Sequence, residues 1–294
     1  MQKLYSISLF LICIAFFSCR ELVTDQFPHY DQKPVVNAVI VANDTMLVHL
    51  SYASSIGIEP LAVIENAIVE ISDSSGYAEV LDYRGDGIYK SQTTAVAGAT
   101  YYITVKVDGF ETVTAQCTVP NAEQIVDIVH VDIAGVNDEG ATYPSVSVTF
   151  TNNPTETQYF EIVLRLLEYD SERHAELINV TDPIIMNEGI NLAMFSNSMC
   201  VDSVHTVTLN YTTNHFNMST MELFPLIVEF RTIDLSYYQY CRQLYLYQLG
   251  RYPEAFSGNV SPTGLYSNVK NGLGIFGAYS AVVADTIFPT HDIR

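Results

Sequence analysis

Apolar and polar residues alternate along the chain from Pro34 to Pro120. The segments that show this alternation include "PVVNAVIV", "TMLVHLSY", "AIVEIS" and "YYITVKV", and clusters of Gly, Asp and Ser separate them. A period of two residues is typical of strands with one buried face, and the clusters are typical of turns. Seven such strands within about 87 residues match the size of an immunoglobulin-like module. The pattern therefore predicts a self-contained, immunoglobulin-like antiparallel β-sandwich over residues 34–120.

The strand pattern continues over residues 121–294 and changes its period once. Further strands are expected at "QIVDIVHVDIA", "SVSVTF", "YFEIVLRLLEY", "VHTVTLNYT" and "LIVEFRTI". Near residues 235–249, tyrosines and apolar residues recur at intervals of three and four positions, which predicts one amphipathic helix. The closing segment "LGIFGAYSAVVA" is a predicted strand whose small residues permit close approach of another backbone. We therefore expect a mainly β protein whose second domain is a larger β-sandwich-like unit with one helix.

The second domain contains a tyrosine-rich helix and a polar segment without periodicity. The tyrosine stripe of the predicted helix suits packing across a sheet, which needs an apolar stripe, and it also suits a platform for a ligand. We favour packing. The segment from Asp170 to Val201 is polar and without periodicity, so we expect long loops there.

The N-terminal segment indicates where the protein resides. Residues 4–17 are apolar apart from two serines and one tyrosine, and these 14 residues fall short of the roughly 20 that a spanning helix needs. Phe16 fits an ordinary secretory cleavage site badly, whereas "FFSC" is similar to a bacterial lipobox, in which the cysteine after the cut carries diacylglycerol. We therefore predict a lipoprotein signal peptide over residues 1–18, lipidation of Cys19 and a polar tether over residues 19–33. Plain secretion and an uncleaved anchor are the alternatives.

The acidic composition argues against several partners. The chain has 294 residues, with 13 Lys plus Arg against 33 Asp plus Glu and a formal net charge of −20. Such a field repels phosphate backbones and anionic membrane surfaces, so we expect no nucleic-acid partner.

If Cys13 leaves with the signal and Cys19 carries lipid, the remaining cysteines are Cys117, Cys200 and Cys241. An odd number argues against a disulfide framework, and a bridge between Cys200 and Cys241 stays open.

No sequence pattern marks a catalytic centre. The GxSxG, HExxH and Walker motifs are absent, no GxGxxG follows a predicted strand, and the seven histidines are scattered without metal-ligand spacing. No CxxC pair and no calcium-loop order are present, so we expect neither a cofactor nor a metal. Asp127 and Asp132 are candidates for a glycosidase-type pair only in the sense that any two acids are. The protein is therefore predicted not to be an enzyme.

Several segments carry a family resemblance over nearly the whole mature chain. In order they are Cys19 with Glu21, "KPVVNAVI", "IENAIVEISDSSG", "GDGIYKS", "GATYYITVKVDGFETVTAQCTVP", "SYYQYCRQLYLYQ" and "SNVKNGLGIFGAYS". Together they resemble Bacteroidota lipoproteins catalogued as domain of unknown function 4249. The resemblance implies an outer-membrane location, no established activity, and a role beside TonB-dependent receptors in nutrient uptake. Acidic residues after the cysteine favour surface display in this phylum, but "RELVTD" has only Glu21 and Asp25, so the membrane face stays open.

The expected function is binding without catalysis. We predict an accessory ligand-binding or docking subunit for a TonB-dependent transporter, with a structural or adhesive surface lipoprotein as the alternative. The candidate interface is the segment 170–201 together with the loop "PEAFSGNVSPTGLYSN", because binding residues concentrate on loops. Within this candidate interface, Tyr252, Phe256 and Tyr266 are the predicted anchors, since exposed aromatic residues are common at interfaces. The alternative is that these rings cover the edge of the core.

Overall fold

Strands make up most of the protein. The computed structural model describes residues 32–53, 62–138, 140–168, 171–212, 223–250 and 264–289. The first part of the chain forms β1 (Pro34–Val41), β2 (Thr45–Tyr52), β3 (Ala67–Asp73), β4 (Ala78–Val80), β5 (Asp82–Gly85), β6 (Ile88–Thr94), β7 (Thr100–Val107) and β8 (Val113–Thr118). The rest forms β9 (Ile125–Val136), β10 (Thr142–Thr151), β11 (Tyr159–Glu168), β12 (Ser171–His174), β13 (Glu176–Leu177), α2 (Pro183–Glu188), β14 (Met194–Ser196), the 3-10 helix η1 (Asn197–Met199), β15 (Val204–Thr212), β16 (Leu226–Ile233), α3 (Leu235–Gly250) and β17 (Leu273–Val283). The prediction of a mainly β protein is confirmed.

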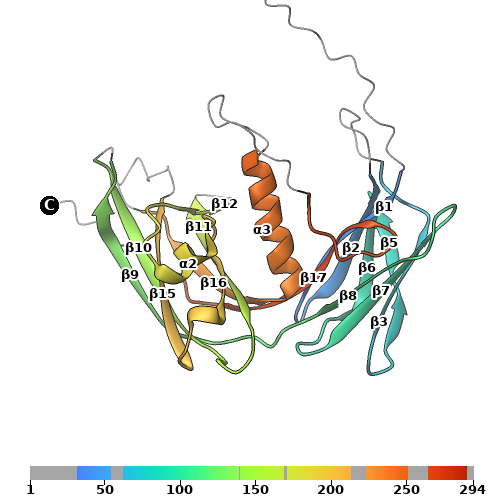
Figure 1. The fold of residues 1–294 in the computed structure, drawn as a ribbon, viewed down its shortest axis with the longest axis horizontal. Helices are drawn as coiled ribbons and strands as arrows, with labels where there is room; N and C mark the ends of the chain where they lie inside the picture. The colour runs from blue at the N-terminus through green and yellow to red at the C-terminus, as the bar shows by residue number, and fades with distance from the viewer. Residues whose placement is uncertain are drawn as a thin grey trace, which may run out of the picture.

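One nine-stranded sheet connects the two halves of the chain (Figure 1). Its order is β12, β11, β16, β17, β1, β2, β6 and β5, and β14 also pairs with β11. The pairing of β1 with β17 is parallel, from Val35 opposite Leu273 to Val41 opposite Tyr279. The neighbouring pairs of this sheet are antiparallel. The parallel pair therefore joins the N-terminal strand of the described chain to its last strand.

Each half of the long sheet is covered by a smaller sheet, so the molecule has two hydrophobic cores. The sheet β4-β3-β7-β8 covers β1, β2 and β6, and buried residues such as Ile40, Leu50 and Ile103 fill the space between them. The sheet β13-β15-β10-β9 covers β11 and β16. In this second core the ring centroids of Phe150 and Phe230 lie 4.6 Å apart. Both halves are sandwich-like, as the alternating pattern predicts.

The first sandwich is not self-contained, and that part of the prediction is wrong. β17 adds Phe276 and Ala278 to the core that residues 34–120 were expected to fill alone. The expectation that small residues let this segment approach another backbone is confirmed at Gly274, where a Cβ atom would lie 2.1 Å from the carbonyl oxygen of Val36. Alternation along a strand indicates which side chains are buried, but it does not indicate which strand lies beside it.

The prediction of long loops between residues 170 and 201 is also wrong. Within its described part this segment forms β12, β13, α2, β14 and η1. Ile184, Ile185 and Phe195 are buried in the second core. The apolar residues of this segment come in short groups between polar ones, so neither a period of two nor a period of 3.6 is visible in the sequence.

The helix predicted near residues 235–249 is confirmed as α3, which stands between the two sandwiches (Figure 1). None of its described side chains is fully buried, so its division into an apolar and a polar face is weaker than expected. Tyrosine explains the difference, because the ring packs while the hydroxyl reaches a polar partner. Tyr238 packs against Tyr159 at 4.6 Å between ring centroids, and Tyr237 packs against Tyr279 at 6.0 Å. These contacts agree with the interpretation that the tyrosine stripe packs on the sheet.

Candidate functional site

The sheet beside α3 carries charged side chains on the face that points away from the second core. Successive side chains of a strand point to opposite faces. In β11, Phe160 and Ile162 enter the core, and Glu161 between them does not. In β16, Phe230 enters the core and Arg231 does not. Glu161 and Arg231 are opposite each other in the ladder, so they share this outer face.

Arg231 is the centre of an ion-pair network on this face. Its Nη1 atom lies 2.9 Å from Glu161 Oε2, and its Nε atom lies 2.6 Å from Glu229 Oε1. The guanidinium carbon lies 4.5 Å from the centre of the Tyr279 ring, which adds a cation–π contact. Burial acts against the charged form, but the hydrogen bond to Glu229 and the charge of Glu161 raise the pKa of Arg231 above its ordinary value. Tyr237 of α3 donates a 3.1 Å hydrogen bond to Glu161, so the network ties the helix to the sheet.

Asp234 fixes the start of α3 on β17. Its Oδ1 atom accepts hydrogen bonds from the backbone N–H groups of Tyr237 at 2.9 Å and Ala278 at 3.1 Å. The first of these is an N-cap bond, and the second crosses to the sheet. A Cβ atom at Gly277 would lie 3.2 Å from Asp234 Oδ1, so glycine gives the carboxylate room there. Burial raises the pKa of Asp234 to about 6, although these backbone hydrogen bonds act in the opposite direction.

Replacing Asp234 with asparagine should change how stability depends on pH. Because the pKa of Asp234 rises from 3.8 to about 6 on folding, the folded state binds more protons between these values, and its stability falls as pH rises through them. Asparagine is an equally good N-cap without a charge. The stability of Asp234→Asn relative to the wild type should therefore increase by roughly 1–3 kcal/mol from pH 4 to pH 7.

Urea denaturation at the two pH values measures this difference. Asp234→Ala is the control, because it removes the cap as well as the charge and should be destabilised at pH 4 by about 1 kcal/mol. A constant difference between Asp234→Asn and the wild type at both pH values would contradict the expected titration of Asp234.

Glu188 holds the short helix α2 against α3. Its side chain is buried, its Oε2 atom lies 3.1 Å from Arg242 Nη1, and it also accepts a hydrogen bond from the Tyr238 hydroxyl. Its Oε1 atom accepts a 2.8 Å hydrogen bond from the backbone N–H of Ser196. One carboxylate therefore connects α2, α3 and the end of β14.

The start and end of α2 are defined by local side chains. Asp182 caps the helix by accepting a 2.9 Å hydrogen bond from the Ile184 N–H, and Pro183 occupies the first helical turn, where its missing N–H costs nothing. Gly189 ends the helix with a φ of 69°, a conformation that favours glycine. The chain then turns back along α3 to β14.

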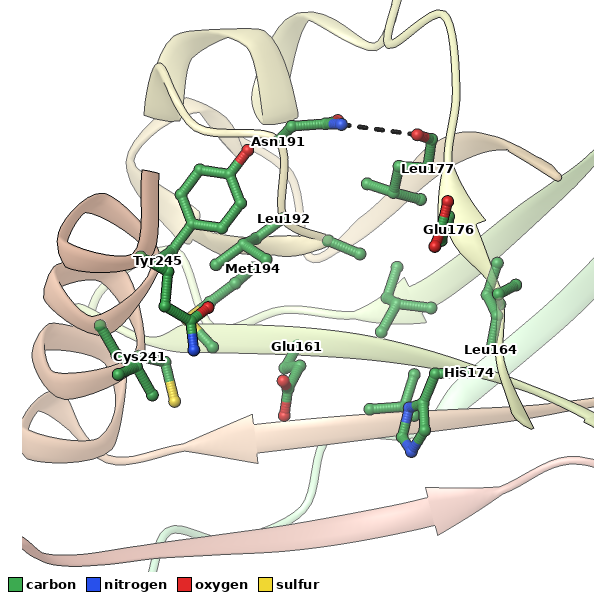
Figure 2. A pocket seen from close by; sticks show the side chains of 16 residues that line it. Glu161, Leu164, His174, Glu176, Leu177, Asn191, Leu192, Met194, Cys241 and Tyr245 are labelled. Carbon is green, nitrogen blue, oxygen red and sulfur yellow. Dashed lines mark hydrogen bonds between the residues drawn. The ribbon is translucent and has the colours of Figure 1, made fainter. Parts of the chain in front are cut away.

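Two adjoining cavities lie between α3 and these segments, and we call them together the α3 groove. The first has a volume of about 510 Å³, and its walls come from α3, β11, β12 with β13, and the chain before β14. The second has a volume of about 480 Å³ and lies between the end of α3 and the segment around α2. Asn191 and Tyr245 line both cavities. Figure 2 shows the first cavity, with Tyr245 and Cys241 on the helix side and His174 and Glu176 on the opposite side.

The α3 groove combines apolar walls with polar groups at separate points. Leu192, Leu244 and Met194 supply apolar surface, while Glu161 lies at the floor beside β11 (Figure 2). At the rim, Asn191 Nδ2 donates a long hydrogen bond of 3.4 Å to the Leu177 carbonyl. Such a mixture suits a molecule with an apolar body and a hydrogen-bonding end.

The thiol of Cys241, which lines the groove, is poorly suited to nucleophilic attack. Burial, followed by the charge of Glu161, raises the pKa of Cys241 to about 12, so its thiol stays protonated at neutral pH. Cys117, Cys200 and Cys241 are free, so the Cys200–Cys241 bridge that the sequence left open is not formed. Across the described ranges, no group of three or more His, Cys, Asp or Glu side chains is arranged to hold a metal ion.

The predicted interface is found in part at this groove. Residues 174–177 and 191–194 of the predicted interface segment 170–201 line the first cavity. The predicted anchors Tyr252 and Phe256 and the predicted lipidation site Cys19 lie outside the described residues. Tyr266 is half-buried, and its hydroxyl lies 3.5 Å from Ser236 Oγ near the start of α3, away from the groove. Tyr245 lines the groove and belongs to the tyrosine stripe of the predicted helix. The interpretation of that stripe as a platform for a ligand is therefore the part of the sequence analysis that points to Tyr245.

The two acids considered for catalysis are not brought together. Asp132 lies 3.0 Å from His130 Nδ1, and His130 Nε2 lies 2.9 Å from the hydroxyl of the buried Tyr211. Burial lowers the pKa of His130, against the effect of Asp132. Asp127 is exposed on the same strand. The polar side chains of Asp132, His130 and Tyr211 therefore satisfy one another at the edge of the second core.

The fold and the groove define the class of protein: a mainly β protein with two sandwich-like halves and a groove bordered by a helix. The chain belongs to the family described as domain of unknown function (DUF4249), whose match covers residues 20–284. No curated protein matches the chain. Among the described residues, no helix has the length and apolar character that a membrane span requires.

Proposed function

We propose that this protein is a non-catalytic lipoprotein of the outer membrane that captures an amphiphilic ligand in the α3 groove and delivers it to a TonB-dependent transporter. The α3 groove is the observation that carries the proposal. Its two cavities, of about 510 and 480 Å³, adjoin along one helix and are of the size that small-molecule sites have. Capture needs shape and hydrogen bonds, and it needs no reactive group.

The walls of the groove are preorganised. Asp234 fixes the start of α3 on the sheet, and Glu188 fixes its middle to α2. A ligand therefore meets side chains that are already held, which lowers the entropy cost of binding. The rim carries exposed apolar side chains at Leu246 and Leu249 of α3 and at Met186 of α2.

The charges around the groove favour a neutral or cationic end on the ligand. Glu161 at the floor of the first cavity is paired with Arg231, so the bias comes from the chain as a whole, which has a net charge of −20. A carboxylate or phosphate on the ligand would meet an unfavourable field. His174 at the wall of the first cavity adds a hydrogen-bonding ring.

The anchor in this proposal is lipid on Cys19, exposed after removal of residues 1–18, with residues 19–33 as the tether. The support is the short apolar segment over residues 4–17, which is followed by Ser18 and Cys19 to give the sequence "FFSC" at residues 16–19. A tether of this length permits the groove to reach a transporter in the same membrane, whichever face carries the protein.

Photo-crosslinking in intact cells tests both parts of the proposal. A photoreactive phenylalanine derivative replaces Leu246, which is exposed at the rim of the second cavity. After illumination, mass spectrometry should identify either a TonB-dependent receptor or a small-molecule adduct on the labelled protein. The same substitution at Ile68 of β3, which is also exposed but distant from the groove, is the matched control and should capture neither.

A second control concerns the anchor. The variant Cys19→Ala should not incorporate labelled palmitate, and Leu246 crosslinking to the receptor should be lost in this background because the protein is no longer held at the membrane. If the palmitate-labelled, folded protein captures nothing at Leu246, ligand delivery is wrong and the structural or adhesive alternative gains support.

A further inference from the structure

β9 is a long edge strand. Within the part of the chain that the structure describes, it is the last strand of the sheet β13-β15-β10-β9, and it lies at the outer end of the second sandwich (Figure 1). It is 12 residues long, "IVDIVHVDIAGV". The edge of β9 that faces away from β10 therefore offers a row of backbone N–H and C=O groups to another strand.

The side chains of β9 add an apolar surface to this edge. Five apolar side chains of β9 have exposed fractions between 43% and 59%: Val126, Val129, Val131, Ile133 and Val136. Edge strands are commonly protected by lysine, by proline, by short length or by a β-bulge. β9 has neither lysine nor proline and is long, and its protective feature is a bulge opposite Pro144. A strand with these properties is suited to pairing with a second strand.

The sequence of β9 is complementary to itself in one antiparallel register. If a two-fold axis passes through Val131, this residue lies opposite its own copy. In the same register Val129 lies opposite Ile133, and Val126 lies opposite Val136. Each exposed apolar side chain of β9 therefore lies opposite an exposed apolar side chain of the other copy, and such apolar cross-strand pairs stabilise a sheet.

The acidic residues of β9 agree with the same register. Asp132 lies opposite His130 of the other copy, whose ring is already held by Asp132 and Tyr211 of its own copy, and Asp127 lies opposite Gly135. No acid faces an acid, and like charges directly opposite one another would be destabilising. Moving the axis by one residue to His130 would place Asp127 opposite Ile133, so the apolar matching would be lost.

The pairing of β9 with β10 contains a β-bulge. Tyr143 of β10 is opposite Gly135 and Ser145 is opposite Val131, so residues 132–134 of β9 face only Pro144, which has no N–H group to donate. The unpaired groups of this stretch face β10, so the outer edge of β9 stays available, with a local increase in twist.

We propose that β9 is a self-association surface, through which two copies of this protein pair antiparallel about Val131. The two four-stranded sheets then form one continuous sheet of eight strands. Because each copy carries a net charge of −20, repulsion opposes the dimer at low ionic strength. The fraction of dimer should therefore increase with salt, which is the opposite of what an interface held by ion pairs would show.

Cysteine crosslinking of the full-length protein in membranes tests the register. Directly opposite residues have Cβ atoms roughly 4.5–5.5 Å apart, so Val131→Cys should form a disulfide with its own copy under mild oxidation. Two copies of Val129→Cys would be separated by four residue positions, roughly 13 Å, and should stay monomeric. Copies carrying Val129→Cys and Ile133→Cys, expressed together with different tags, should crosslink to each other. Ile68→Cys, exposed on β3, is the control for random collision.

The outcomes separate self-pairing from the alternatives. A reactive but uncrosslinked thiol at residue 131 would overturn the proposal, and so would a disulfide from residue 131 to a different protein. Equal dimer yields at residues 129 and 131 would overturn the register. Because Val131 is exposed, Val131→Lys should fold normally, and its sedimentation in detergent should give a monomer under the salt conditions that make the wild type dimeric.

Discussion

Replacing Phe276 with alanine should lower the free energy of unfolding by about 3–5 kcal/mol, the range for truncating a buried phenylalanine. Phe276 is fully buried, and it reaches the first core from β17, far along the chain from the other strands of that core. Its backbone is also fixed, because its N–H donates to Asn268 Oδ1 at 2.9 Å and its carbonyl accepts from Asn268 Nδ2 at 2.8 Å. The cavity left by the ring therefore cannot close by movement of β17 alone.

Chemical denaturation of the full chain measures this loss. Phe288→Ala is the matched control, since Phe288 is 71% exposed and its truncation should change stability by less than about 0.5 kcal/mol. A fragment of residues 34–120 lacks Phe276 and the parallel partner of β1, so it should show no cooperative melting transition. A stable, cooperatively melting fragment would mean that β17 is dispensable for the first sandwich.

The sequence predicts the strands of this fold better than their partners. The alternation in "PVVNAVIV" identifies β1 as a half-buried strand, and the two-residue period is observed in its burial. Nothing in that alternation distinguishes a neighbour in the next hairpin from one at residues 273–283. Gly274 indicated that another strand could approach the backbone of β17 closely, but it did not indicate that this strand is β1.

The candidate site was harder to predict than the fold. The helix α3 follows from its spacing of tyrosines, but the α3 groove depends on α2 and on the chain before β14, which the sequence presents as a polar, irregular segment. Besides the buried Ile184, Ile185 and Phe195, Glu188 holds this segment in place, because one buried carboxylate satisfies Arg242, Tyr238 and the Ser196 N–H. A glutamate with three distant partners has no signature in a single sequence.

Replacing Arg231 with methionine should destabilise the protein by about 3 kcal/mol, which is the lower end of the cost of leaving a buried charge without its partner. The side chains of Arg231, Glu161 and Glu229 are only 10% to 19% exposed. Glu229 keeps a second cation, Arg165, at 3.3 Å, so the larger penalty falls on Glu161. Methionine fills similar volume, which limits the loss of packing.

Arg84→Met is the matched control for this substitution. Arg84 forms an ion pair with Asp82 at 3.0 Å, but the two side chains are 54% and 44% exposed, and such pairs contribute 1 kcal/mol or less. The double variant Arg231→Met with Glu161→Gln should recover part of the lost stability, because it removes the unpaired charge. Urea denaturation of the single and double variants gives these differences directly. If Arg231→Met is no more destabilising than Arg84→Met, the network does not hold α3 on the sheet, and the floor of the α3 groove is fixed by the tyrosine contacts alone.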